Sequence, residues 1–171
     1  MQGHPGGKAH TEHMIALAHL PSGSRWLDFG AGNGEAIRIL RESGFQAQGV
    51  DLRPRGPEVT EGDFLQTEYP TGSFDGILSQ CALFASENSA KALLEAGRLL
   101  RQGGILAFSD VCFDEKELID SVHAAGFSII HREDLTAVWR DYFLEALWKE
   151  EVTCSIPKGK CSYLLLICER M

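Results

Sequence analysis

Residues 26–34 read WLDFGAGNG, and the fold can be inferred outward from this stretch. Its first four residues form a short apolar run that is typical of a buried strand. Three glycines at alternate positions follow, and they let the backbone turn sharply and leave no Cβ between it and a ligand. A helical pattern begins directly afterwards and covers 35–43, so its first amide groups face whatever occupies the turn. The stretch predicts a strand, a ligand-binding loop and a helix, with a ligand-free tight turn as the alternative.

Apolar runs and helical patterns alternate along the rest of the chain. Strands are predicted at 47–50, 74–79, 105–109, 127–130 and 161–168, and helices at 11–20, 88–101, 115–125 and 135–147. Between residues 51 and 63 there is room for at most a very short strand. This rhythm predicts an α/β fold with an open, mostly parallel, doubly wound sheet. The last strand breaks the rhythm, and we expect it to insert antiparallel beside its neighbour.

Composition points to a globular domain that acts on a small molecule. The chain has 171 residues, 44% of them hydrophobic, and a formal net charge of −8. That charge and the lack of a basic patch exclude nucleic acid as a partner. We find no signal peptide and no apolar run long enough to cross a bilayer, so no membrane partner is expected. The five cysteines form no CxxC pair, which suits a reducing, cytoplasmic location.

The predicted elements suggest a single domain over residues 1–171 with two special segments. Residues 1–21 form an N-terminal arm and helix. Residues 135–160 lie between the last two strands, where they form a small lid, a dimer face or ordinary core packing. The oligomeric state is therefore left open by the sequence.

Acidic residues accompany the predicted strands at the edge of the sheet where ligands bind in open α/β folds. Asp28 lies just before the glycine turn, Asp51 ends the second strand, and Asp63 follows in the sequence EGDF. A carboxylate in the position of Asp51 can accept hydrogen bonds from both hydroxyls of an unphosphorylated ribose. A strand-end carboxylate in water is the plainer alternative for Asp51 and Asp63, and a mere tight turn is the alternative for Asp28.

Five segments in order resemble the motif series of class I S-adenosylmethionine-dependent methyltransferases. These segments read LDFGAGNG, GVD, GDF, FDGILS and LLRQGGILAFSD. The resemblance covers about half the chain and implies a Rossmann-like methyltransferase fold, S-adenosylmethionine as the cofactor, and methyl transfer to an unidentified small-molecule acceptor. The stretch from Asp51 to Asp63 is shorter than is usual in that family, and the N-terminal arm is brief.

The resemblance also implies a role for each cofactor-binding position. Asp28, together with the backbone at Gly30 and Gly32, holds the methionine part of the cofactor. Asp51 holds the ribose.

Three further positions follow from the same resemblance. Asp63 hydrogen-bonds the adenine amino group, while Phe64 packs nearby or offers its amide. Ser79, at the end of the fourth strand, presents backbone to the methionine amine.

The sequence identifies no catalytic residue. If the acceptor is a hydroxyl or an amine, a base would help, and Asp110, His10 and His13 are the candidates. A thiolate acceptor would need no base. The N-terminal histidines lack the acidic or cysteine partners of a recognisable site, so no metal is expected.

Two cysteines and two rival functions complete the analysis. Cys81 and Cys112 each fall just beyond a central strand, where they bind a thiophilic ligand or serve as small apolar residues. A nicotinamide-dependent oxidoreductase usually has the spacing GxGxxG, whereas the third glycine here comes one residue early. A non-catalytic protein that binds S-adenosylmethionine is the other alternative.

Overall fold

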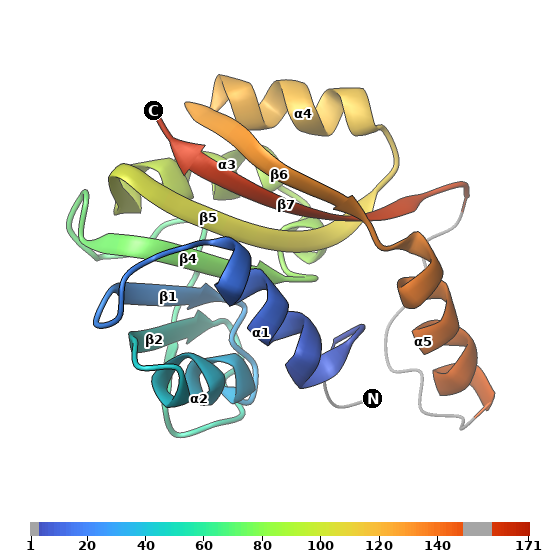
Figure 1. Cartoon of the computed structure of the whole chain (residues 1–171), viewed down its shortest axis with the longest axis horizontal. Helices are drawn as coiled ribbons and strands as arrows, with labels where there is room; N and C mark the ends of the chain where they lie inside the picture. The colour runs from blue at the N-terminus through green and yellow to red at the C-terminus, as the bar shows by residue number, and fades with distance from the viewer. Residues whose placement is uncertain (1–3, 149–158) are drawn as a thin grey trace.

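The structure, a computed structural model, describes residues 4–148 and 159–171 (Figure 1). The strands are β1 (Arg25–Phe29), β2 (Gln46–Asp51), β3 (Val59–Glu61), β4 (Phe74–Gln80), β5 (Leu100–Cys112), β6 (Phe127–Asp134) and β7 (Ser162–Arg170). The helices are α1 (Gly7–Leu17), α2 (Glu35–Glu42), α3 (Ser89–Leu99), α4 (Glu115–Ala124) and α5 (Thr136–Trp148), with a 3₁₀ turn, η1 (Phe84–Ser86). The very short strand expected between residues 51 and 63 is β3.

All seven of these strands belong to one sheet, in the order β3-β2-β1-β4-β5-β7-β6. The first five pair in parallel, and β7 runs antiparallel to both β5 and β6. The mostly parallel sheet and its antiparallel C-terminal strand are thereby confirmed. Because β7 inserts between β5 and β6, the strand that precedes it in the chain becomes the edge of the sheet.

Helices cover both faces of the sheet, α1 and α2 one face and α3 and α4 the other (Figure 1). Alternate residues of β1, β5 and β7 enter opposite apolar clusters, as Trp26 and Leu27 of β1 do. The helical pattern predicted over 35–43 forms α2, whose buried residues are Ala36, Ile37, Ile39 and Leu40. The helix α5 lies beyond the sheet, at the end toward which β1 and β4 run.

The connection between β2 and β3 is unusual because it contains no helix. Residues 52–58 instead pack against the glycine loop, where the Arg55 N–H donates to the Gly32 carbonyl at 2.8 Å. A Cβ on Gly56 would lie only 2.4 Å from the Asn33 carbonyl oxygen, so backbone meets backbone here. A parallel crossover normally takes a dozen or more residues, and this connection is too short to hold a helix.

Gly103 and Gly104, which follow the helix predicted over 88–101, lie inside β5. The helix predicted over 88–101 ends at Leu99, and β5 begins at once with Leu100. The register between β4 and β5 shifts at this point, and Gly103 has a φ of +71°. The glycines therefore permit an irregularity in a long strand rather than a helix terminus.

The predicted insertion over 135–160 is only partly visible, since residues 149–158 lie outside the described residues. Within α5, Trp139 is buried and its ring stacks on that of Tyr163 of β7, with ring centroids 6.4 Å apart. Val138, Leu144 and Trp148 of the same helix are exposed. None of the helices in the described part of the chain has the length and hydropathy that a membrane span requires.

Candidate functional site

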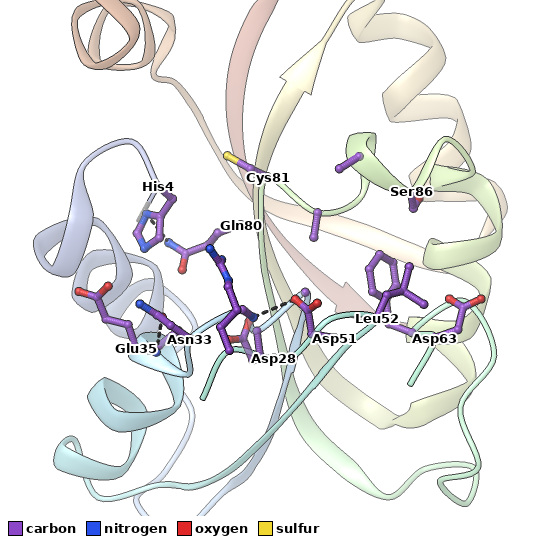
Figure 2. Close-up of a pocket in the computed structure, with 18 of the residues that line it drawn as sticks. His4, Asp28, Asn33, Glu35, Asp51, Leu52, Asp63, Gln80, Cys81 and Ser86 are labelled. Carbon is purple, nitrogen blue, oxygen red and sulfur yellow. Dashed lines mark hydrogen bonds between the residues drawn. The ribbon is translucent and has the colours of Figure 1, made fainter. Parts of the chain in front are cut away.

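A cavity of about 600 Å³ opens at the carboxyl ends of β1, β2 and β4 (Figure 2). Its walls come from the glycine loop, the connection after β2, the segment 63–65 and the turn after β4. Figure 2 shows His4 and Gln80 at one end, Asp63 and Ser86 at the other, and Asp28 and Asp51 between them. The volume lies within the range of cavities that hold small organic ligands.

Six of the seven predicted cofactor positions line this cavity, and they are Asp28, Gly30, Gly32, Asp51, Asp63 and Phe64. The seventh, Ser79, does not line it. Its side chain is fully buried within β4, and its hydroxyl has no hydrogen-bond partner among the described residues. The next residues along the chain, Gln80 and Cys81, form the wall instead.

The glycine loop has the positive φ angles that its sequence predicts, at Gly30 (+72°) and Gly32 (+52°). A Cβ on Gly30 would lie 2.6 Å from the Cβ of Ala82, and one on Gly32 would lie 2.8 Å from a guanidinium nitrogen of Arg55. The missing side chains therefore make room for neighbouring segments as well as for a ligand. Sequence reasoning assigned these positions to a sharp turn and to ligand access, and did not foresee the close approach of Ala82 and Arg55.

Asp51 ties the end of β2 to the glycine loop. Its Oδ2 accepts a hydrogen bond from the Gly32 N–H at 2.9 Å, drawn in Figure 2, and its Oδ1 accepts one from the Arg53 N–H at 2.7 Å. An ionised carboxylate offers about four acceptor sites. Two of them remain for hydroxyl donors of a ligand.

Asp28 is a buried carboxyl that faces the cavity without a hydrogen-bond partner among residues 4–148 and 159–171. Its residue is 4% exposed, and no hydrogen bond from the described residues reaches its side chain. Burial, and secondly the charge of Asp51, raises the pKa of Asp28 to about 8. A buried polar group that lacks a partner calls for an explanation, and a ligand with a donor or a positive charge provides one.

Asp63 and Phe64 form the other end of the cavity. Asp63 is exposed, and its Oδ1 accepts a hydrogen bond from the Leu65 N–H at 2.8 Å. Phe64 is buried and stacks on Phe29 of β1, with ring centroids 5.0 Å apart. The Phe64 ring thus joins the core to the cavity wall.

Asp110 does not reach this cavity. It lines a second, smaller cavity of about 220 Å³ on the α4 side of the sheet. Its Oδ2 accepts the N–H of Phe84 at 3.1 Å, so it anchors the turn η1, whose Ala85 and Ser86 line the main cavity. Burial raises the pKa of Asp110 to about 6.

The two histidine candidates also lie away from the cavity. His10 is buried in α1, with Nε2 2.9 Å from the hydroxyl of Ser109, and burial lowers its pKa to about 4. His13 is exposed, and its Nε2 lies 2.9 Å from a carboxylate oxygen of Glu133.

Sequence reasoning missed several residues of the wall, above all His4, Gln80 and Arg55. The side chains of His4 and Gln80 lie 3.2 Å apart, and the hydroxyl of Thr11 contacts both. Burial lowers the pKa of His4. Gln80 directly follows the strand predicted over 74–79, which was a usable signal, whereas nothing near Arg55 in the sequence marks it.

The two cysteines that were predicted just beyond central strands line different cavities. Cys81 lines the main cavity with a φ of +57°, and its Sγ lies 3.1 Å from the hydroxyl of Tyr163. Cys112 lines the smaller cavity. Across residues 4–148 and 159–171, no group of three or more His, Cys, Asp or Glu side chains is arranged to hold a metal ion.

Comparison with known proteins agrees with this geometry. A model of the methyltransferase domain family matches residues 8–147. An uncharacterized methyltransferase of Geobacillus kaustophilus is 32% identical over 133 residues, which is 68% of this chain and 62% of the relative. The chain thus spans about three-fifths of the length of such curated relatives.

Solved structures share the fold at low identity. Phosphoethanolamine N-methyltransferase 2 of Haemonchus contortus, in complex with phosphomonomethylethanolamine and S-adenosylhomocysteine, superimposes with a TM-score of 0.81 at 17% identity, over 98% of this chain and 53% of that one. The [4+2]-cyclase SpnF superimposes with a TM-score of 0.77 at 21% identity, over 95% of this chain and 80% of that one. Because the family model covers most of the chain, this protein belongs to the class I S-adenosylmethionine-dependent methyltransferases.

Proposed function

We propose that this chain transfers a methyl group from S-adenosylmethionine to a small-molecule acceptor at the 600 Å³ cavity. The observation that carries the proposal is the grouping of Asp28, the glycine loop and Asp51 around that one cavity, with the carboxyl of Asp28 unpartnered by the described residues. A bare loop, a hydroxyl acceptor and a buried carboxyl are what a ligand with a ribose and positive charges requires.

The residues present suit each part of the cofactor. Asp28 and the backbone at Gly30 and Gly32 would hold the methionine part, and the free acceptor sites of Asp51 would take the ribose hydroxyls. At the far end, Asp63 and Phe64 would meet the adenine. The backbone contact with the methionine amine, which the resemblance assigned to Ser79, would be made by Gln80 or Cys81 instead.

When bound, the cofactor supplies an electrophilic methyl group on a sulfonium. The contribution of the chain is to bind, to orient the acceptor and to exclude water. Asp110, His10 and His13 do not line the cavity, and in the proposed arrangement His4 takes their place as the candidate base. Burial lowers its pKa, which keeps the imidazole neutral and able to accept a proton.

A single domain, with the α5 region as a small lid, and a cytoplasmic location are parts of the same proposal. The exposed apolar residues of α5, Val138, Leu144 and Trp148, support a covering role. Cys112, Cys161 and Cys168 are free thiols, which is compatible with a reducing compartment.

The test has two stages. Calorimetry with S-adenosylhomocysteine measures cofactor binding, and mass spectrometry then follows the transfer of a labelled methyl group to a panel of amines, phosphoamines, alcohols and thiols. We expect binding and transfer to at least one class. Because the SpnF cyclase shares the fold, the second stage is needed. Binding without transfer to any acceptor would favour a non-catalytic cofactor-binding protein, and binding of NADH in place of the adenosyl ligand would overturn the assignment.

A further inference from the structure

We propose that Arg55 binds the carboxylate of the cofactor's methionine part, an assignment that rests on the proposed function of the cavity. The guanidinium of Arg55 lines the cavity and lies across Gly32, within the loop expected to meet that part of the cofactor.

The charge distribution of the cavity first points to this residue. Five acidic residues line it, and they are Asp28, Glu35, Asp51, Asp63 and Glu87. Among the described lining residues, Arg55 alone has a permanent positive charge. The other basic residue, His4, is neutral at pH 7 because burial lowers its pKa.

The cofactor carries three charges with different needs. Its sulfonium and its ammonium are positive and suit a cavity rich in carboxylates. Its carboxylate is repelled by the same walls unless a cation or several N–H donors face it. A guanidinium meets this need well, because its planar fork matches the geometry of a carboxylate.

The position of Arg55 is set by backbone contacts rather than by an ion pair. Its own N–H donates to the Gly32 carbonyl at 2.8 Å, and the following residue, Gly56, packs on the backbone of Asn33. None of the salt bridges formed by residues 4–148 and 159–171 involves Arg55. Its donors therefore remain available to a ligand.

The short connection after β2 explains why this residue is there. A crossover helix would carry residues 52–58 away from the glycine loop. Without a helix, the connection folds directly onto that loop and brings a side chain from the ribose side of the cavity to Gly32. The assignment is therefore a consequence of this chain's own loop.

The experiment compares a ligand that has the carboxylate with two that lack it. Dissociation constants are measured by calorimetry for S-adenosylhomocysteine, for its decarboxylated analogue and for 5′-methylthioadenosine, which lacks the amino-acid part. We expect Arg55→Gln to weaken S-adenosylhomocysteine about tenfold, the loss of one charge-assisted hydrogen bond, and to leave the other two ligands unchanged. Arg55→Lys keeps the charge without the fork and should lose about threefold.

Arg53→Gln is the matched control. It removes the same charge two residues away, from a side chain that is exposed and does not line the cavity, while its backbone N–H stays in place. All three ligands should bind this variant as they bind the wild type.

Three results would overturn the assignment. Equal weakening of all three ligands by Arg55→Gln would mean that the residue acts on the nucleoside or on the loop. A carboxylate-specific loss in His4→Gln, with none in Arg55→Gln, would move the subsite to the N-terminal arm. If the wild type bound none of the ligands, the proposed function would fail first, and this inference would fail with it.

Discussion

The cavity has a buried wall and an exposed wall, and they are built differently. The buried wall consists of the ends of β1, β2 and β4 and the glycine loop, and it includes Asp28, which is 4% exposed, and Asp51. The exposed wall is the segment from Leu52 to Asp63, which is mostly loop and open to water. Interactions of charges in the buried wall are little screened, whereas those in the exposed wall are weakened by water and salt. The buried wall should therefore determine whether the cofactor binds, and the exposed wall should adjust how tightly.

The largest difference between the walls should appear when equivalent carboxylates are removed. Asp51→Ala deletes a carboxylate that accepts the Gly32 N–H and that is also the proposed acceptor for the ribose hydroxyls. We expect it to weaken binding of S-adenosylhomocysteine by at least about a hundredfold, because two charge-assisted interactions are lost. Calorimetry measures the change.

Asp63→Ala is the control from the exposed wall, and it should cost about tenfold or less, since its carboxylate is exposed. Equal losses in the two variants would erase the distinction between the walls.

The pH dependence of stability should also distinguish the two walls, because the buried wall contains Asp28. The pKa of Asp28 is raised from its ordinary 3.8 to about 8, so the folded protein holds a proton that the unfolded chain releases. The free energy of unfolding should therefore fall as pH rises between those values and become level above about 8. The slope is expected to reach about 1 kcal/mol per pH unit, or about 3 °C in Tm.

Thermal melts of Asp28→Asn should show this slope removed between about pH 6 and 8, which lies above the pKa of Asp110. Asp63→Asn is again the exposed control, and its melts should follow the wild type. A slope that persists in Asp28→Asn would show that another group carries it.

The smallest expected effect concerns the support behind the wall rather than the wall itself. Asp110 accepts the Phe84 N–H and thereby holds η1 against the cavity. Asp110→Asn should weaken S-adenosylhomocysteine about threefold, because an amide replaces one acceptor with a donor.

Below about pH 6 the wild type should approach this variant, since the pKa of Asp110 lies there. Asp120→Asn, an exposed carboxylate on α4 paired with Lys116, removes the same charge and should change nothing. If Asp110→Asn bound S-adenosylhomocysteine like the wild type at pH 7, Asp110 would not be needed to hold η1 against the cavity.

The direction in which Asp110 points illustrates what pattern analysis lacked. Ser109 and Asp110 are neighbours near the end of β5, and Asp110 was predicted to lie at the ligand edge as a candidate base. In a strand they face opposite sides, so Ser109 meets His10 of α1 while Asp110 meets η1. Which side is which depends on the helices that cover the sheet. Packing of the helices thus decides that Asp110, a candidate base, lines the smaller cavity and not the main one.

The end of α3 shows the reverse error. Gly103 and Gly104 look like a helix terminus because glycine commonly ends helices. Pairing of β4 with β5 begins at Phe74 and Leu100, however, and this long-range contact extends the strand through both glycines. Local preference gave way to strand pairing.

The sequence by itself determined the strand–glycine loop–helix unit, the apolar face of α2, the acidic end of β2 and the antiparallel last strand. These features depend on local periodicity, on turns that only glycine enters easily, and on short connections, all of which a single stretch of chain carries. Only the tertiary structure decided that Arg55 lies over Gly32, that His4 joins Gln80 at the cavity and that Asp28 stays buried without a partner from the described residues. Those outcomes depend on which distant segments pack together, because burial and the charges of neighbours belong to the assembled fold and to no segment alone.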